Sequence, residues 1–118
     1  MQFVLMIYHG PKPTIPGSAS WNALPESEQK QVYADYAELN KTNGFTPGPP
    51  LGLFNAAKTV QVADGKTQIK DGTYQTESVG GYAVIEAENI EAAIALAQRI
   101  PAARLGGAIE IRPVEKYW

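Results

Sequence analysis

The chain has 118 residues, a mass of 12.8 kDa, 44% hydrophobic residues and a formal net charge of −2 at pH 7. This size fits a single domain spanning residues 1–118, and the mild negative charge excludes the basic surface that direct nucleic-acid binding requires. The absence of cysteine excludes disulfides and thiolate catalysis, and the lone histidine excludes a multi-histidine metal site, so we expect neither a metal nor a cofactor.

Residues 2–8 are a short apolar run with β-branched and aromatic members, which predicts a fully buried strand. The run has no basic region before it, and no segment approaches the roughly 18 apolar residues of a membrane span. We therefore expect no signal peptide, no membrane contact and a cytoplasmic location. From His9 to Leu24, prolines and glycines forbid regular structure, and we expect a loop that folds over a pocket with Trp21 packed against the domain.

Two helices and a hairpin are predicted further along. Val32, Tyr36 and Leu39 fall on one face of a helix over residues 26–43. The Pro- and Gly-rich segment 46–52 is unsuited to a central strand. Asp64-Gly65 is the turn signal of a type I′ hairpin that joins Val60 and Val62 to a strand over 66–70.

The last third of the chain predicts a strand over 81–86, a helix from Ile90 to about Ile100, and a strand over 108–112. Asn89 should cap this helix and Pro101 should end it. The helix should bury one face, which holds Ile90, Ala93, Ile94, Ala97 and Ile100.

This order of elements predicts an α+β fold of the ferredoxin-like split βαβ type, an antiparallel sheet with two helices on one face. The other face of the sheet would be bare in a monomer, so we expect a homodimer.

The candidate site residues lie near the predicted strand ends. His9 suits a general base because its pKa is near neutrality, or else it bonds backbone carbonyls at the end of its strand. Asp71 either orients His9 or caps its own Asp-Gly turn. Glu77, in the same polar loop, is a candidate ligand contact because it has no evident packing role.

Arginine and tyrosine side chains extend this set. Arg104 either clamps a carboxylate or phosphate, or forms a salt bridge to Glu110 or contacts the C-terminus of a helix. Tyr8, Tyr74 and Tyr82 either line the pocket with ring and hydroxyl or belong to the core.

Several of these segments together resemble the YCII-related family, in the branch known for an Asp-Gly-Pro-Phe motif. The matching segments cover most of the chain: Leu5-Met6-Ile7-Tyr8; Trp21, Leu24, Tyr33, Tyr36 and Leu39; Thr59-Val60-Gln61-Val62; Asp64-Gly65-Lys66; Asp71-Gly72; Thr76-Glu77; Gly80-Gly81-Tyr82; and Pro101–Arg104 with Glu110–Pro113. The chain departs from the motif itself, where Thr73-Tyr74 replace Pro-Phe.

The resemblance implies a dimeric α+β barrel in which two sheets pack together. Some relatives look like hydrolases or dehydrochlorinases with a His–Asp pair, whose histidine starts the first helix. Residues 25–30 contain no histidine, so that pair does not carry over. Relatives of this branch also often occur with extracytoplasmic-function sigma factors, which implies a regulatory role.

Three functions follow from these observations. The first is a dimeric small-molecule-binding protein, linked to regulation, whose pocket between sheet and helices is lined by Tyr8, His9, Asp71, Tyr74, Glu77 and Arg104. The second is a cofactor-free hydrolase or lyase in which His9 is the base and Asp71 orients it. The third is an interaction module for an extracytoplasmic-function sigma factor.

Overall fold

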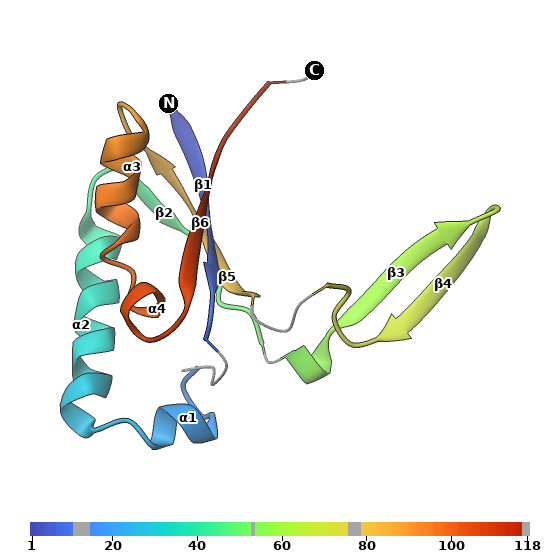
Figure 1. Cartoon of the computed structure of the whole chain (residues 1–118), viewed down its shortest axis with the longest axis horizontal. Helices are drawn as coiled ribbons and strands as arrows, with labels where there is room; N and C mark the ends of the chain where they lie inside the picture. The colour runs from blue at the N-terminus through green and yellow to red at the C-terminus, as the bar shows by residue number, and fades with distance from the viewer. Residues whose placement is uncertain (11–14, 53, 76–78, 117–118) are drawn as a thin grey trace.

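The computed structural model describes residues 1–10, 15–52, 54–75 and 79–116. Its elements follow in the order β1 (Gln2–Tyr8), α1 (Ala19–Asn22), α2 (Glu26–Lys41), β2 (Phe45–Pro47), η1 (Phe54–Ala56), β3 (Lys58–Ala63), β4 (Lys66–Asp71), β5 (Val79–Glu86), α3 (Ile90–Ala97), α4 (Pro101–Arg104) and β6 (Ala108–Pro113) (Figure 1). Within these ranges, every helix is too short or too polar to traverse a lipid bilayer.

The main sheet has the strand order β2-β5-β1-β6, and every neighbouring pair is antiparallel. β1 and β2 flank β5 and are joined through α2, so the first half of the chain is a split βαβ unit. Helices α2 and α3 lie on one face of this sheet (Figure 1). The predicted ferredoxin-like α+β fold is confirmed.

The core lies between the sheet and the helices, and strand alternation decides which residues enter it. Phe3, Leu5 and Ile7 of β1 are buried, whereas the residues between them are only partly buried. The predicted full burial of this strand is therefore wrong, because the part of the chain that the structure describes covers only one face of the sheet. The rest of the core comes from α2, the neighbouring strands and the segment 93–102, and it includes Leu39, Phe45, Ala83, Ile85, Ala93, Ala97, Ile100 and Ala102.

Two helix predictions need correction. Ala19–Asn22 is helical inside the predicted irregular loop, because the prolines end before it and Ser18 accepts a hydrogen bond from the Trp21 N–H. The helix predicted to end near Ile100 ends at Ala97, and Pro101 starts the separate helix α4 instead.

The first turns of α3 explain a second difference in burial. Asn89 caps this helix as predicted, and its Oδ1 accepts a hydrogen bond of 2.9 Å from the Ala92 N–H. Ile90 and Ile94 are nevertheless exposed, while the small Ala93 and Ala97 face the core. The predicted buried face was too wide, because α3 packs through its alanine side.

The sheet's second face, which we call the open face, is not covered by any described element of the chain. Strand alternation places Val4, Met6 and Tyr8 of β1 on it, and the register adds Tyr82 and Val84 of β5. Tyr82 is exposed, whereas the other four residues are partly buried. The centre of the open face is thus apolar.

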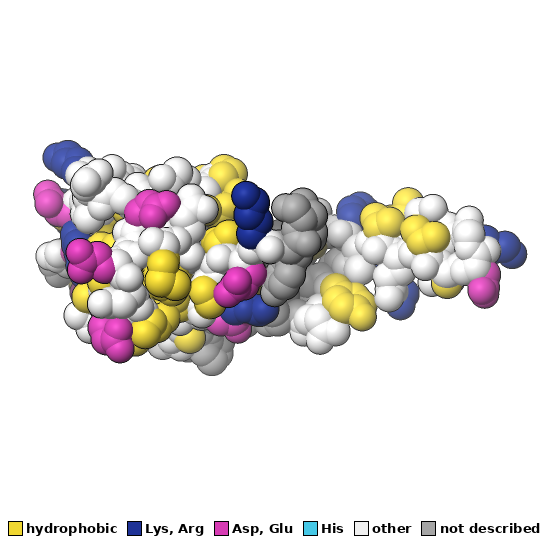
Figure 2. All heavy atoms as spheres, turned by 90° about the horizontal axis from the view of Figure 1, so that it is seen from above, with side chains coloured by type: hydrophobic (Ala, Val, Ile, Leu, Met, Phe, Trp, Pro, Cys, Tyr) yellow, Lys and Arg dark blue, Asp and Glu magenta, His cyan; other side chains and the backbone are white. Residues whose placement is uncertain are grey.

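Strands β3 and β4 form a separate two-stranded arm. Its turn is the predicted Asp64-Gly65, and both residues have the positive φ angles, 50° and 73°, that a type I′ turn requires. The arm stands clear of the body and carries hydrophobic side chains on its surface (Figure 2). It is inserted between β2 and β5, so it interrupts the connection that would otherwise be a simple hairpin.

Candidate functional site

A cavity of about 340 Å³ lies between α2, the edge strand β2 and the start of β5. This volume falls within the range of small-molecule sites. Residues from five segments of the chain line it: Ile7 and His9; Ile15 and Pro16; Val32, Tyr33, Tyr36 and Asn40; Phe45 and Pro47–Leu51; and Gly80–Ala83. The cavity is therefore assembled by the tertiary fold and not by one local motif.

His9 is the imidazole of this cavity. It directly follows β1, and its ring lies against Gly80, where any side chain would run into Nε2 and Cδ2 of the ring. Nδ1 is buried and has no hydrogen-bond partner among the described residues. Nδ1 thus makes no hydrogen bond to a backbone carbonyl of the described residues, which the alternative of a strand-end histidine held by backbone carbonyls would require.

Burial also sets the charge of His9. Desolvation lowers the pKa of its imidazole below the ordinary value of 6.5, because the cationic form loses its hydration. The ring is consequently neutral at pH 7. A neutral imidazole has one nitrogen that donates and one that accepts a hydrogen bond.

The remaining walls are aromatic and uncharged. Tyr36 is partly buried, and desolvation raises the pKa of its phenol, so its hydroxyl stays protonated. Tyr33 and Phe45 add aromatic surface, and Asn40 adds a neutral amide. No Asp, Glu, Lys or Arg lines the cavity within the described part of the chain.

The segment before α2 covers part of this cavity. Ile15 and Pro16 line it, and Trp21 is buried with its ring edge against Tyr33 at a centroid distance of 5.3 Å. Gln29 Nε2 donates a hydrogen bond of 2.8 Å to the Trp21 carbonyl, which ties the segment to α2. The predicted packing of Trp21 is confirmed. Residues 11–14 of the predicted loop lie outside the described residues.

Three other predicted site residues lie elsewhere. Tyr8 lies on the open face, on the other side of β1 from the cavity. Tyr74 follows the arm and is 66% exposed. Asp71 ends β4, where its carboxylate pairs with Nζ of Lys58 on the neighbouring strand. His9 and Asp71 form no hydrogen bond, so the predicted acid–base pair is not assembled within the chain.

Glu77 lies outside the described residues, so its predicted ligand contact stays a prediction. Within the part of the chain that the structure describes, no group of three or more His, Cys, Asp or Glu side chains could hold a metal ion.

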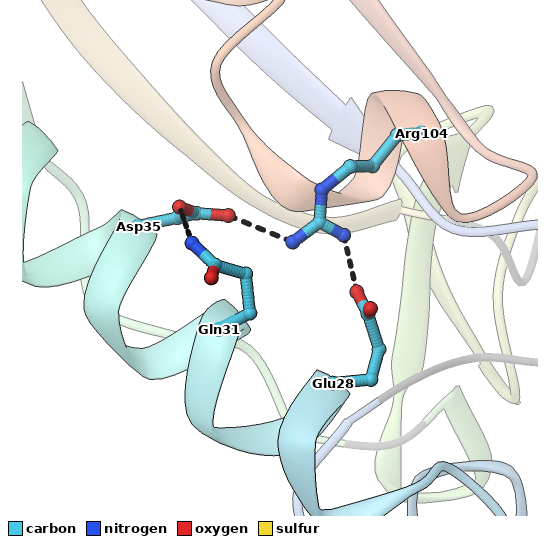
Figure 3. Close-up of polar contacts among 4 residues, drawn as sticks. All are labelled: Glu28, Gln31, Asp35 and Arg104. Carbon is cyan, nitrogen blue, oxygen red and sulfur yellow. Dashed lines mark hydrogen bonds and ion pairs between the residues drawn. The ribbon is translucent and has the colours of Figure 1, made fainter.

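Arg104 is a bridge between helices. Its guanidinium forms ion pairs with Glu28 and with Asp35, the latter at 2.7 Å, so α4 is clamped to α2 (Figure 3). Partial desolvation raises the pKa of the Asp35 carboxyl. Hydrogen bonds from Arg104 and Gln31 outweigh this contribution, so the pKa lies below its usual value. Arg104 does not line the His9 cavity, and the predicted partner Glu110 pairs with Arg112 instead.

The comparison with known families agrees with this architecture. The model of the YCII-related domain matches residues 1–117. The chain belongs to the YCII-related family. No curated protein matches the chain significantly. Membership in the Asp-Gly-Pro-Phe branch stays a prediction, since the family match is broader than that branch.

Sequence reasoning for this YCII-related chain found His9 but missed the wall that faces it. Tyr33, Tyr36 and Asn40 recur at spacings of three and four residues, so they share one face of α2. That spacing was the signal available in the sequence.

Proposed function

We propose that this YCII-related protein is a homodimer that binds a small, uncharged, largely aromatic molecule carrying a hydroxyl group in the His9 cavity. The observation that carries the proposal is the buried, unpartnered Nδ1 of His9, a residue that lines an apolar cavity. Buried polar atoms in proteins nearly always have a hydrogen-bond partner, so an unpartnered one on a residue that lines a cavity is a candidate ligand contact, which the imidazole can make once it turns toward the ligand.

The charge of the ligand follows from the lining. A carboxylate or phosphate entering the cavity would lose its hydration without meeting a cationic side chain among the described lining residues. His9 does not supply the charge, because burial lowers its pKa. An uncharged ligand avoids this desolvation cost.

The polar group of the ligand follows from His9. Either tautomer of a neutral imidazole can occupy the cavity, and Nδ1 is a donor in one and an acceptor in the other. A hydroxyl can satisfy both, since it donates and accepts. The rings of Tyr33, Tyr36 and Phe45 offer edge and face contacts to an aromatic ligand.

The homodimer is proposed from the open face. Val4, Met6, Tyr8, Tyr82 and Val84 present a contiguous apolar surface that no described element of the same chain covers. A two-fold dimer would bury this surface against its own copy, and C2 symmetry is the commonest arrangement of homo-oligomers.

Thermal unfolding with paired probes tests the binding proposal. Phenol and benzoate have similar size but differ in charge and polar group. Saturating phenol should raise the Tm by several degrees through linkage, while benzoate should not. His9→Leu should abolish the phenol effect. Equal stabilisation by both probes, or none by phenol, would overturn the proposal.

A second candidate is a cofactor-free hydrolase or lyase in which His9 alone accepts a proton. The lowered pKa of His9 supports it, because the imidazole is already in its basic form at neutral pH. Turnover with an activated ester, lost in His9→Gln, would establish catalysis. Phenol binding without turnover of the ester would support the binding function and contradict catalysis.

A further inference from the structure

The β3–β4 arm has one apolar face and one polar face. The cross-strand pairs Val60–Ile69 and Val62–Thr67 share one face with the ion pair at the base of the arm. The side chains of Val60, Val62 and Ile69 are 60%, 67% and 68% exposed. The opposite face is polar apart from one alanine, and its pairs are Thr59–Lys70, Gln61–Gln68 and Ala63–Lys66.

Nothing else in the described chain supports this arm. Its two strands pack on each other and make no more than marginal contact with the other helices and strands. An isolated two-stranded hairpin is at best marginally stable in water, and exposed valine and isoleucine side chains add no stability to it. We therefore expect the apolar face of the arm to be buried against a partner.

The position of the arm identifies that partner. In Figure 1 the helices lie on one side of the main sheet, and the arm projects on the other side, where the open face is turned. A second copy seated on the open face would lie in the corner between sheet and arm. Figure 2, the view from above, shows hydrophobic side chains on the surface of the arm.

We propose that Val60, Val62 and Ile69 pack against a second copy of this chain that is bound at the open face, so that each arm contacts the other copy. The proposal rests on the dimer in the proposed function and adds a second contact region to it. By two-fold symmetry both arms contribute equally, because residues that one copy presents are presented by the other as well. The partner that covers the apolar face of the arm is thus a second copy of the same chain.

Two matched double variants test the arm. Val60→Lys with Ile69→Lys places two charges on one cross-strand pair of the apolar face. Gln61→Lys with Gln68→Lys places the same charges on the adjacent pair of the polar face. Both variants place two like charges on one cross-strand pair, and Gln61→Lys with Gln68→Lys places them beside Lys66 and Lys70, so the repulsion within the arm is at least as large in this control. Circular dichroism should show a folded body in both, since the arm supports no other element.

Sedimentation velocity over a dilution series should give a dimer Kd that the apolar-face variant raises about tenfold or more. The polar-face variant should stay within about twofold of wild type. Equal Kd values in all three proteins, or equal weakening in both variants, would overturn the arm contact while leaving the sheet-face dimer in place.

Hydrogen exchange separates the remaining outcomes. Arm amides should be protected at dimer concentrations and exchange rapidly after dilution, because an isolated hairpin opens readily. A dimer whose arm amides exchange as fast as those of the diluted protein would overturn the arm contact alone. A wild-type chain that is monomeric throughout would overturn both the arm contact and the proposed dimer, whereas phenol binding is measured independently.

Discussion

The imidazole of His9 occupies the space that a side chain at Gly80 would fill. The two residues lie at the ends of neighbouring strands. Because Gly80 has no side chain, the His9 ring packs against the sheet at this position and lines the cavity. Burial of the ring follows from this contact, and so does the lowered pKa. Gly80 thus positions His9 without contacting a ligand through a side chain of its own.

Gly80→Ala should displace the His9 ring from the cavity. The added Cβ overlaps the ring, so the ring must rotate away or the strand must shift, at a cost of roughly 1–3 kcal/mol in unfolding free energy. The pKa of His9 should rise toward 6.5 as the ring regains water, which proton NMR of this single histidine can follow.

Gly81→Ala is the matched control. Its Cβ would lie 3.9 Å from Cδ1 of Ile7, which is an ordinary contact, so the pKa of His9 should not change. A lowered His9 pKa that persists in Gly80→Ala would show that Gly80 does not position the ring.

Stability should fall as the pH falls below 6.5. Because burial lowers the pKa of His9, the unfolded chain binds its proton at a higher pH than the folded chain. This contribution is fully present above pH 6.5 and is lost as the pH falls through the folded-state pKa. Urea unfolding of wild type and His9→Leu between pH 5 and 8 measures it, since His9→Leu lacks this group and the difference isolates it. Parallel pH profiles of the two proteins would contradict a partly buried, neutral imidazole at His9.

Arg104→Ala should destabilise the fold without weakening ligand binding. The guanidinium bridges Glu28 and Asp35 at a partly exposed site, so its loss should cost about 1–2 kcal/mol. Arg104→Lys should retain part of this, because an ammonium cannot hold both carboxylates in a planar fork. Chemical denaturation gives the first result and phenol titration the second. A drop in phenol affinity with unchanged stability would contradict this account and indicate that Arg104 contacts the ligand.

Trp21→Ala should cost about 3–5 kcal/mol, as for other buried aromatic side chains. The substitution removes the edge contact with Tyr33 and frees the segment that covers the cavity. Tyr74→Ala is the control, because that side chain is exposed and its loss should change little. Similar melting of Trp21→Ala and wild type would mean that this segment is not anchored by Trp21.

The fold was predictable because its signals are local. The Asp64-Gly65 turn needs positive φ angles, and Asn89 satisfies a free helix N–H, so both appear in the sequence as residue choices. The exposure of Ile90 and Ile94 was not predictable in this way. Which side of α3 meets the sheet depends on how closely the helix approaches, and alanines allow the closest approach.

The site was less predictable because it is assembled from distant segments. His9 was found by its chemistry alone. Tyr8 was misplaced, because neighbouring residues of a strand point to opposite faces, and the sequence did not show which face held the cavity. Asp71 was misplaced because the hairpin that contains it projects from the body instead of folding back.

The most direct test of the proposed ligand site is NMR of the His9 ring nitrogens during a phenol titration at pH 7.5. The account predicts saturable shifts of the Nδ1 resonance, absent with benzoate and lost in Gly80→Ala, with the ring neutral throughout. An Nδ1 resonance that does not move with phenol, or that moves equally with benzoate, would contradict a neutral hydroxyl-bearing ligand at His9.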